Sequence, residues 1–196
     1  MKTNAKLSKR LFFELDRSDA PRRAVASPNV ALKRILAPMD FSECSKKAAR
    51  YAIALARQFN SEVVLVHVVK PLTPAVTPEL VVVETDPMNA ELRENAARKL
   101  ARWRRKYVSM ARIKAVVRSG FSIHQEIVAA GRETSADLIV IAAHDKSGLA
   151  HLFTGSVAEQ VVRHAPCPVL VLREHERDFV ALEKRKAGFM PSRRRP

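Results

Sequence analysis

The chain has 196 residues, 47% of them hydrophobic, which suffices for one substantial buried core and argues for a single domain with tails. Its two cysteines lie far apart and lack CxxC spacing, which argues against a disulfide scaffold and a four-ligand zinc site. Its net charge of +15 points towards polyanions such as nucleic acid, ribosomes or an anionic membrane surface.

Residues 1–32 are predicted to be a basic, flexible N-terminal extension. They hold seven Lys or Arg against three acidic residues. The run LFFEL follows a basic start, as in a signal peptide, but charges flank and interrupt it. No apolar run approaches the roughly 20 residues of a membrane span. We therefore expect a cytoplasmic protein without a membrane span.

Strand and helix patterns alternate from Lys33 onward. The first pair is a short strand that ends at Asp40 and a helix over 42–59, for which Ser42 is the expected N-cap. The expected apolar face of this helix comprises Ala48, Ala52, Leu55, Ala56 and Phe59. The β-branched run SEVVLVHVV then predicts a strand that is buried on both faces.

A proline-containing loop over 72–87 leads to a long basic helix over about 87–107. Its apolar residues recur at helical spacing, so we expect this stripe to face the sheet while the charges face water. The stripe comprises Leu92, Ala96, Leu100, Trp103 and Tyr107. The alternative is that the two aromatic residues, interleaved with Lys and Arg, stack on nucleic-acid bases.

The remaining elements complete a repeating pattern of strand and helix. They are a strand over 111–120, a helix over 122–136, a strand over 137–143, a helix over 156–165 and a strand over 168–172. Helical crossovers imply parallel pairing, so the predicted fold is α/β, with one doubly wound sheet and helices on both faces. Ligands of such sheets bind at the carboxyl ends of strands, here between the first and fourth strands.

Two segments fall at that edge, APMDFS after the first strand and the loop after the fourth strand. Gly155 and Ser156 open a helix whose free amides and dipole attract an anion. Asp145 opposes this, because a carboxylate about 4 Å from a phosphate charge costs on the order of 1 kcal/mol in water and about 4 at an intermediate dielectric. A magnesium ion that accepts Asp145 as a ligand would turn this repulsion between carboxylate and phosphate into a net attraction. Asp40 has two interpretations of equal weight, a helix cap and a ligand contact.

No catalytic constellation is apparent, so we do not expect an enzyme, and a slow nucleotide hydrolase ranks last because no general base is positioned. The histidines lack metal-ligand spacing and are expected to be structural or on the surface; they are His67, His124, His144, His151, His164 and His175. Cys44, near a helix start, could have a lowered thiol pKa, whereas Cys167, between two prolines, is expected to be structural.

Three stretches carry a family resemblance, APMDFSECSKKAARYAIALA, LVHVV and above all GSVAEQVVRHAPCPVLVL. This is a resemblance to the universal stress protein family, and it spans about Lys33 to Leu172. It implies a five-stranded sheet of order 3-2-1-4-5, a homodimer through the last strand from Pro168 to Leu172 and, in one subclass, ATP binding. It also implies three parts, the extension 1–32, the domain 33–172 and a basic C-terminal tail 173–196.

The ATP-binding subclass carries a glycine, two residues, a second glycine, nine residues, a third glycine and a serine or threonine. These positions correspond here to Ala142, Asp145, Gly155 and Ser156, so two are kept and two are replaced. The resemblance also places Pro38 and Asp40 beside the nucleoside and Val68 against the adenine. The candidate nucleotide site that it implies comprises Pro38, Asp40, Val68, Ile141, Ala142, Asp145, Gly155, Ser156 and Val157.

Two functional hypotheses follow. The first is a dimeric stress protein that senses a nucleotide, with ATP as the candidate ligand and magnesium as its companion if Asp145 is a ligand. The second is an adaptor that binds no nucleotide and acts through protein or polyanion contacts of its basic tails and second helix. Salt dependence separates them, because polyanion binding falls steeply with added salt.

Overall fold

The computed structural model of the chain describes residues 29–73, 86–143 and 157–180. Strands and helices alternate along them within the unit Ala31–Pro196. The strands are β1 (Arg34–Pro38), β2 (Glu62–Val69), β3 (Arg112–Ser119), β4 (Leu138–Ala143) and β5 (Val169–Arg173). The helices are α1 (Glu43–Phe59), α2 (Asp86–Arg105), α3 (Ile123–Glu133) and α4 (Val157–His164). The predicted alternation of strand and helix is confirmed.

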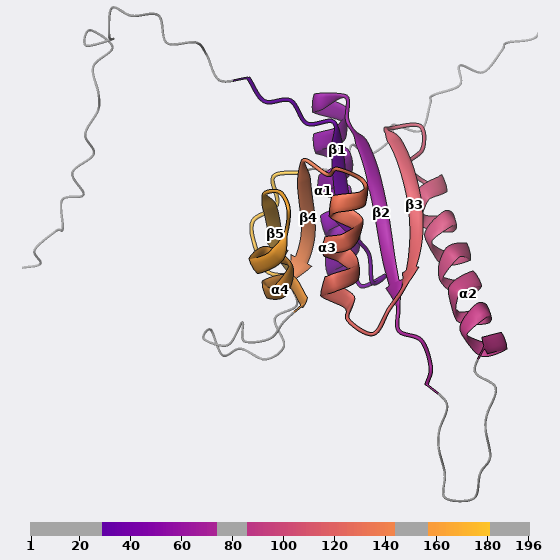
Figure 1. Cartoon of the computed structure of the whole chain (residues 1–196). Helices are drawn as coiled ribbons and strands as arrows, with labels where there is room; N and C mark the ends of the chain where they lie inside the picture. The colour runs from indigo at the N-terminus through magenta and orange to yellow at the C-terminus, as the bar shows by residue number, and fades with distance from the viewer. Residues whose placement is uncertain (1–28, 74–85, 144–156, 181–196) are drawn as a thin grey trace, which may run out of the picture. The chain divides into compact units, whose positions relative to one another are not determined.

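The five strands form one parallel sheet of order β3-β2-β1-β4-β5, which confirms the order that the family resemblance implied. Each neighbouring pair is parallel, because a helix on one face of the sheet returns the chain to the same end before the next strand. All strands therefore end at one edge, which is the lower edge in Figure 1. The chain reverses its direction of travel across the sheet between β1 and β4.

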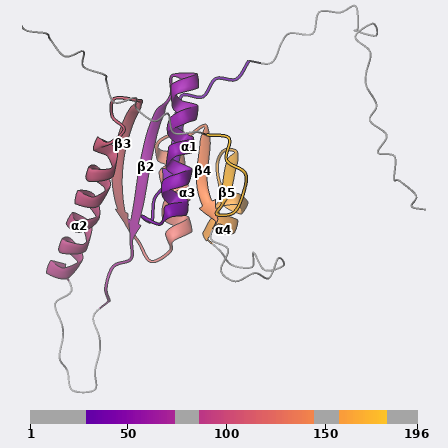
Figure 2. The ribbon, with the colours of Figure 1, turned by 180° about the vertical axis from the view of Figure 1, so that it is seen from behind.

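Helices cover both faces of the sheet, and the doubly wound prediction is confirmed. Figure 1 shows α3 and α4 in front of the sheet, and Figure 2 shows α1 and α2 on the opposite face. Alternate strand residues serve the two faces, so Ile35 and Val63 pack towards α1 while Leu36 and Val64 pack towards α3. A parallel sheet sandwiched in this way has strands rich in Val, Ile and Leu.

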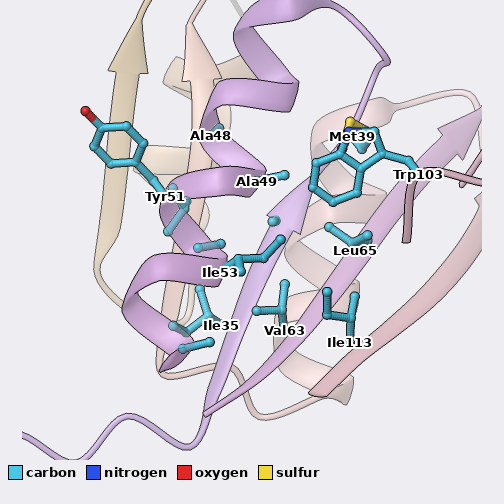
Figure 3. Close-up of a cluster of buried hydrophobic side chains, with 14 of the residues drawn as sticks. Ile35, Met39, Ala48, Ala49, Tyr51, Ile53, Val63, Leu65, Trp103 and Ile113 are labelled. Atoms are coloured by element: carbon cyan, nitrogen blue, oxygen red, sulfur yellow. The ribbon is translucent and has the colours of Figure 1, made fainter. Parts of the chain in front are cut away.

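The core on the α1 face joins both helices of that face to the sheet. Figure 3 shows Trp103 of α2 next to Met39, with Val63 and Leu65 of β2 beneath α1. The hydroxyl group of Tyr51 points away from this cluster, although the whole residue is only 2% exposed. The ring of Tyr51 therefore helps to fill the core, and its polar atom reaches the rim.

The buried face of α1 differs in part from the expected one. Ala48, Ala52 and Ala56 are buried as predicted, whereas Leu55 is only half-buried and Phe59 is 36% exposed. The buried set also includes Ala49, Tyr51 and Ile53. The helix thus packs along a stripe shifted towards Tyr51, because β5 and the segment after it add contacts on that side.

The apolar stripe of α2 faces the sheet, as its periodicity predicted. Ala96, Leu100 and Trp103 are buried, whereas Leu92 is 38% exposed, because the N-terminal half of the helix projects further from the sheet. Tyr107 lies just beyond the end of α2, with its ring centroid 4.5 Å from that of Trp103. The base-stacking alternative is therefore wrong for Trp103. None of the helices within the described residues is long and apolar enough to cross a membrane.

Candidate functional site

The site begins where β1 and β4 part at the carboxyl edge of the sheet. The two strands pair only at Ile35 with Leu138 and at Leu36 with Ile139. Beyond these pairs β1 continues along β2 and β4 continues along β5. The two strand ends therefore diverge at the point where the strand order reverses, which is the usual ligand position in a doubly wound sheet.

Three of the predicted site residues lie on one face of this edge. Val68 and Ile141 both pack against the core beneath α3 and α4. Pro38 follows Leu36 by two residues, so strand alternation places it on the same face. These residues come from β2, β1 and β4, which are neighbours in the sheet. Ala142 instead packs towards the α1 face.

A short chain of hydrogen bonds links Asp40 to the first turn of α1. The amide and the hydroxyl of Ser42 donate to Asp40 Oδ1 at 3.0 and 2.6 Å. The Ser42 hydroxyl oxygen accepts from the Ser45 amide at 3.0 Å. Ser42 is thus the N-cap, which confirms the prediction, and Asp40 orients the cap instead of capping the helix directly. A ligand contact by Asp40 remains a prediction.

The residue between Asp40 and Ser42 is strained. Phe41 has a φ of 68°, in a region that residues other than glycine rarely adopt. Its ring centroid lies 4.7 Å from that of His67, and Lys99 Nζ lies 6.0 Å from the Phe41 ring. His67 Nδ1 lies 2.6 Å from the carbonyl oxygen of Met39, so this nitrogen carries the proton and donates it.

Phe41 and His67 were not among the predicted site residues. Their link depends on contacts between β2 and the loop after β1, which are far apart in the chain. The one available signal was the position of Phe41 directly after Asp40 at a strand end. Strain of this kind is characteristic of ligand sites, because the surrounding structure must hold it in place.

A cavity of about 520 Å³ opens on the α4 side of the same edge. It is lined by Ala143, Ala158, Glu159, Val162, Arg163, Val171 and Arg173. Among the predicted site residues that the structure describes, none lines this cavity, although Ala143 directly follows Ala142. Val157, the first residue of α4, is 38% exposed beside it. Asp145, Gly155 and Ser156 lie outside the described residues.

Cys44 is buried in the first turn of α1, with a relative exposure of 4%. Its sulfur lies 3.8 Å from the carbonyl oxygen of Ala143 and 3.7 Å from that of Leu172. Burial, followed by the charge of Glu174, raises the pKa of this thiol above its ordinary value. The expectation of a lowered pKa is therefore wrong, because loss of water outweighs the helix dipole at this position.

His67, His124 and His164 make contacts within the fold, whereas His175 is exposed. His164 Nδ1 lies 2.8 Å from the carbonyl oxygen of Gln160, and the rings of His124 and His164 are 6.1 Å apart. Within the described ranges, no group of three or more His, Cys, Asp or Glu side chains could hold a metal ion. His144 and His151 lie outside those ranges.

Comparison with known proteins supports the fold. The sequence profile of the universal stress protein family matches residues 31–173. Universal stress protein MJ0531 of Methanocaldococcus jannaschii is 32% identical over 156 residues, which are 74% of this chain and 85% of that protein. The solved UspA from Lactobacillus plantarum is 27% identical with a TM-score of 0.59, covering 74% of this chain and all of that one. A universal stress protein solved in complex with cAMP has the same fold, at 19% identity and a TM-score of 0.56, covering 73% of this chain and 98% of that one.

Proposed function

The chain belongs to the universal stress protein family, and we propose that this stress-response protein senses an adenine nucleotide where β1 and β4 diverge. The divergence beyond Leu36 and Ile139 is the observation that carries the proposal. It leaves Pro38, Val68 and Ile141 on one face at a switch point. A protein of this fold that was solved with cAMP supports an adenine nucleotide as the ligand class.

The nucleoside end of the site would be formed by the strand ends. Val68 offers an apolar surface for the base, and the Asp40 carboxylate can accept from a ribose hydroxyl while it continues to hold Ser42. The strained Phe41 turns the chain from Asp40 towards the cap at Ser42. Pro38 and Ile141 complete this end of the proposed site.

The phosphate end would be formed at the start of α4. Gly155 and Ser156 precede Val157, the first residue of that helix, so its free amides would face the anion. Ala142 and Asp145 replace the two remaining motif glycines, and the Asp145 carboxylate would repel phosphate unless magnesium binds between them. We therefore propose that ATP binds only with magnesium, and no catalytic step is assigned.

Isothermal titration with ATP, with and without magnesium, tests the nucleotide proposal on the wild-type chain beside Asp145→Gly. We expect wild-type binding only with magnesium, and binding by Asp145→Gly without it. Absence of ATP binding by the wild type, together with binding by the variant, would mean that Asp145 prevents binding at the site. Absence of ATP binding by both proteins would overturn the nucleotide proposal.

We also propose a homodimer formed through β5, over Pro168 to Leu172. Within the described strands, β5 pairs with β4 only and so forms an edge of the sheet. The Ile139 amide donates to the Pro168 carbonyl, so by alternation the outward backbone groups of β5 are those of Val169, Val171 and Arg173. An edge strand with unpaired backbone groups is a template for pairing with a second copy.

A polyanion-binding adaptor is the second candidate function, and one observation favours it. From residue 95 to residue 125 the chain holds nine Lys or Arg and no acidic residue. In this stretch Arg98, Lys114 and Arg118 pair with carboxylates. No ion pair within the described residues engages Lys99, Arg102, Arg105, Lys106 or Arg112. The proposed tails, 1–32 and 173–196 around a domain 33–172, would add to this charge.

Salt dependence distinguishes the two candidates. Binding of labelled single-stranded DNA by the wild-type chain and by Arg102→Glu/Arg105→Glu should be measured at several salt concentrations. The adaptor hypothesis predicts a steep loss of affinity with salt and a shallower slope for the variant, because fewer counterions are released. Absence of binding at low salt would contradict it.

A further inference from the structure

The seven residues after β5 lie against α1. They run from Glu174 to Val180 and, in Figure 2, return alongside the sheet from the end of β5. Val180 packs against the core of the α1 face, and the ring centroid of Phe179 lies 4.6 Å from that of Tyr51. We call these residues, 174–180, the clasp.

The main attachment of the clasp is one carboxylate. The Tyr51 hydroxyl donates to Asp178 Oδ1 at 2.8 Å, and Lys47 Nζ lies 3.0 Å from the same oxygen. Tyr51 is 2% exposed and Lys47 is 8% exposed, whereas the Asp178 side chain is 57% exposed. Lys47 and Tyr51 therefore form a receptor in the surface of α1, and the Asp178 carboxylate enters this receptor from solvent.

The receptor also binds the backbone amide of the residue after Asp178. The Phe179 amide donates to the Tyr51 hydroxyl oxygen at 3.0 Å, so this one hydroxyl both donates to the clasp and accepts from it. Phe179 itself remains 72% exposed. Recognition thus depends on the aspartate and the next amide, with Val180 as the apolar anchor, more than on the aromatic ring.

Charge is complementary across the contact. The clasp holds Glu174, Glu176 and Asp178 against Arg177, in a chain whose net charge is +15. Arg50 joins Lys47 and Tyr51 in lining a cavity of about 200 Å³ beneath Asp178 and Val180. Hydrogen bonds from Tyr51 and then Lys47 lower the pKa of Asp178. Burial by itself would lower the pKa of the Lys47 amine. The hydrogen bond to Asp178 and the charge of Asp178 outweigh this effect, so the pKa of Lys47 is raised. The pair is therefore ionised at neutral pH.

The receptor and the clasp also occupy the backbone groups at the end of β5. Lys47 Nζ donates to the Arg173 carbonyl oxygen at 3.4 Å, and the Arg173 amide donates to Glu176 Oε1 at 3.0 Å. These are backbone groups that alternation directs away from β4. Docking of the clasp therefore shortens the free edge of β5 to Val169 and Val171.

We propose that Lys47, Arg50 and Tyr51 form a recognition site for an acidic peptide, and that the clasp occupies this site as a detachable ligand from the same chain. The peptide that fits is an extended segment with a carboxylate, a free amide at the next residue and an aliphatic side chain after that. A peptide of this chemistry from another molecule would compete with Asp178 for Lys47 and Tyr51. The nucleotide site plays no part in this proposal.

The tether decides the competition. A segment attached to β5 by a short link acts at an effective concentration in the millimolar range. A peptide in solution therefore binds weakly while the clasp is docked, because only the small fraction of molecules with an undocked clasp has a free site. Its apparent affinity should rise when the clasp is released, in proportion to the increase in that fraction. Release of Asp178 alone should uncover the site without removing Lys47 or Tyr51.

The experiment uses the full-length chain and a fluorescent peptide with the sequence of residues 174–180, EHERDFV. Anisotropy titration compares the wild type with Asp178→Lys, which repels the clasp from Lys47 and Arg50. Arg177→Gln is the matched control, because it changes the charge of the clasp at a neighbouring exposed residue. Hydrogen exchange of the Phe179 amide reports the docking of the clasp independently.

We expect Asp178→Lys to bind the peptide at least tenfold more tightly than the wild type and Arg177→Gln do. Tyr51→Phe introduced into Asp178→Lys should abolish the gain, as should an aspartate-to-asparagine change in the peptide. The Phe179 amide should be protected in the wild type and exchange faster in Asp178→Lys. Equal binding by the wild type and Asp178→Lys, absence of binding by both, or an unprotected Phe179 amide in the wild type would each overturn the proposal.

Discussion

Asp137 shows what one carboxylate does at the amino edge of the sheet. Its Oδ2 accepts from the amides of Lys33 and Arg34 at 2.7 and 2.8 Å, just where β1 begins. Its own amide donates to the Arg34 carbonyl at 2.9 Å. The hydrogen bond from Arg34 is the largest cause that lowers the pKa of Asp137, with Lys33 adding to it against the effect of burial. The sequence pattern placed Asp137 in a strand over 137–143, whereas in the structure it lies just before β4 and its side chain joins the start of β1 to β4.

Replacement of Asp137 by Ala should lower the free energy of unfolding by about 1–3 kcal/mol at pH 7, because two amides lose a charged acceptor. The pKa of Asp137 is lower in the folded state, so its contribution is full above the unfolded pKa of about 3.9 and is lost as the pH falls through the folded pKa. Urea denaturation at pH 7 and near pH 3 measures this. The gap between the wild type and the variant should narrow at the lower pH.

The conservative control is Asp137→Asn, which keeps a neutral acceptor of similar shape. Its cost at pH 7 should lie between zero and that of Asp137→Ala. A gap between the wild type and Asp137→Ala that stays constant from pH 7 to pH 3 would contradict an ionised anchor.

At the scale of the element, the start of α1 combines a cap, a supporting carboxylate and a strained residue. Ser42 accepts from the Ser45 amide, and Asp40 holds the Ser42 hydroxyl. Phe41, with its positive φ, turns the chain from β1 into the cap. The first turn of α1 thereby comes to lie over the ends of β4 and β5, where Cys44 meets their carbonyl groups.

Replacement of Ser42 by Ala should cost about 0.5–2 kcal/mol of stability, because one amide of the first turn loses its partner. Asp40→Ala should cost less, since water can replace its bond to an exposed hydroxyl. The effects of the two changes should not add, because Asp40 acts through Ser42. A double-mutant cycle by denaturant unfolding measures this, and additive costs would show that Asp40 acts independently of the cap.

At the scale of the whole molecule, the order of the strands decides which surfaces are free. β1, β4 and β2 lie inside the sheet, whereas β3 and β5 lie at its edges. β3 carries exposed Arg112 and Lys114 along its edge, and charges of this kind discourage strand pairing. β5 carries valines and leucines that are half-buried or buried, so it is the edge suited to a second copy.

Sedimentation velocity should show a dimer for the wild type and a monomer for Val171→Pro. Proline removes an outward N–H of an edge strand, where the ladder to β4 does not use it. Val171→Ala is the control, because it keeps the N–H while it shortens the side chain, and it should remain dimeric. A monomeric wild type, or a dimeric Val171→Pro that melts normally, would contradict pairing through β5.

Much of the fold was predictable from the sequence because periodicity is a local property. The run from Glu62 to Val69 and the stripe of Ala96, Leu100 and Trp103 each identify their element and its buried face. The cap at Ser42 was predictable because it depends on neighbours within one helical turn. The candidate site was predictable only as far as strand ends and the family resemblance identify it, and its ligand contacts remain predictions.

The sequence by itself determined the alternation of strands and helices, the parallel pairing and the basic surface of α2, since these follow from local pattern, composition and the chirality of crossovers. Only the tertiary structure decided how remote groups meet. The contact of Phe41 with His67, the burial of Cys44 beneath the ends of β4 and β5, and the capture of Asp178 by Lys47 and Tyr51 all join residues far apart in the chain. Desolvation and hydrogen-bond partners at such contacts depend on the packed environment, which no short window of sequence contains.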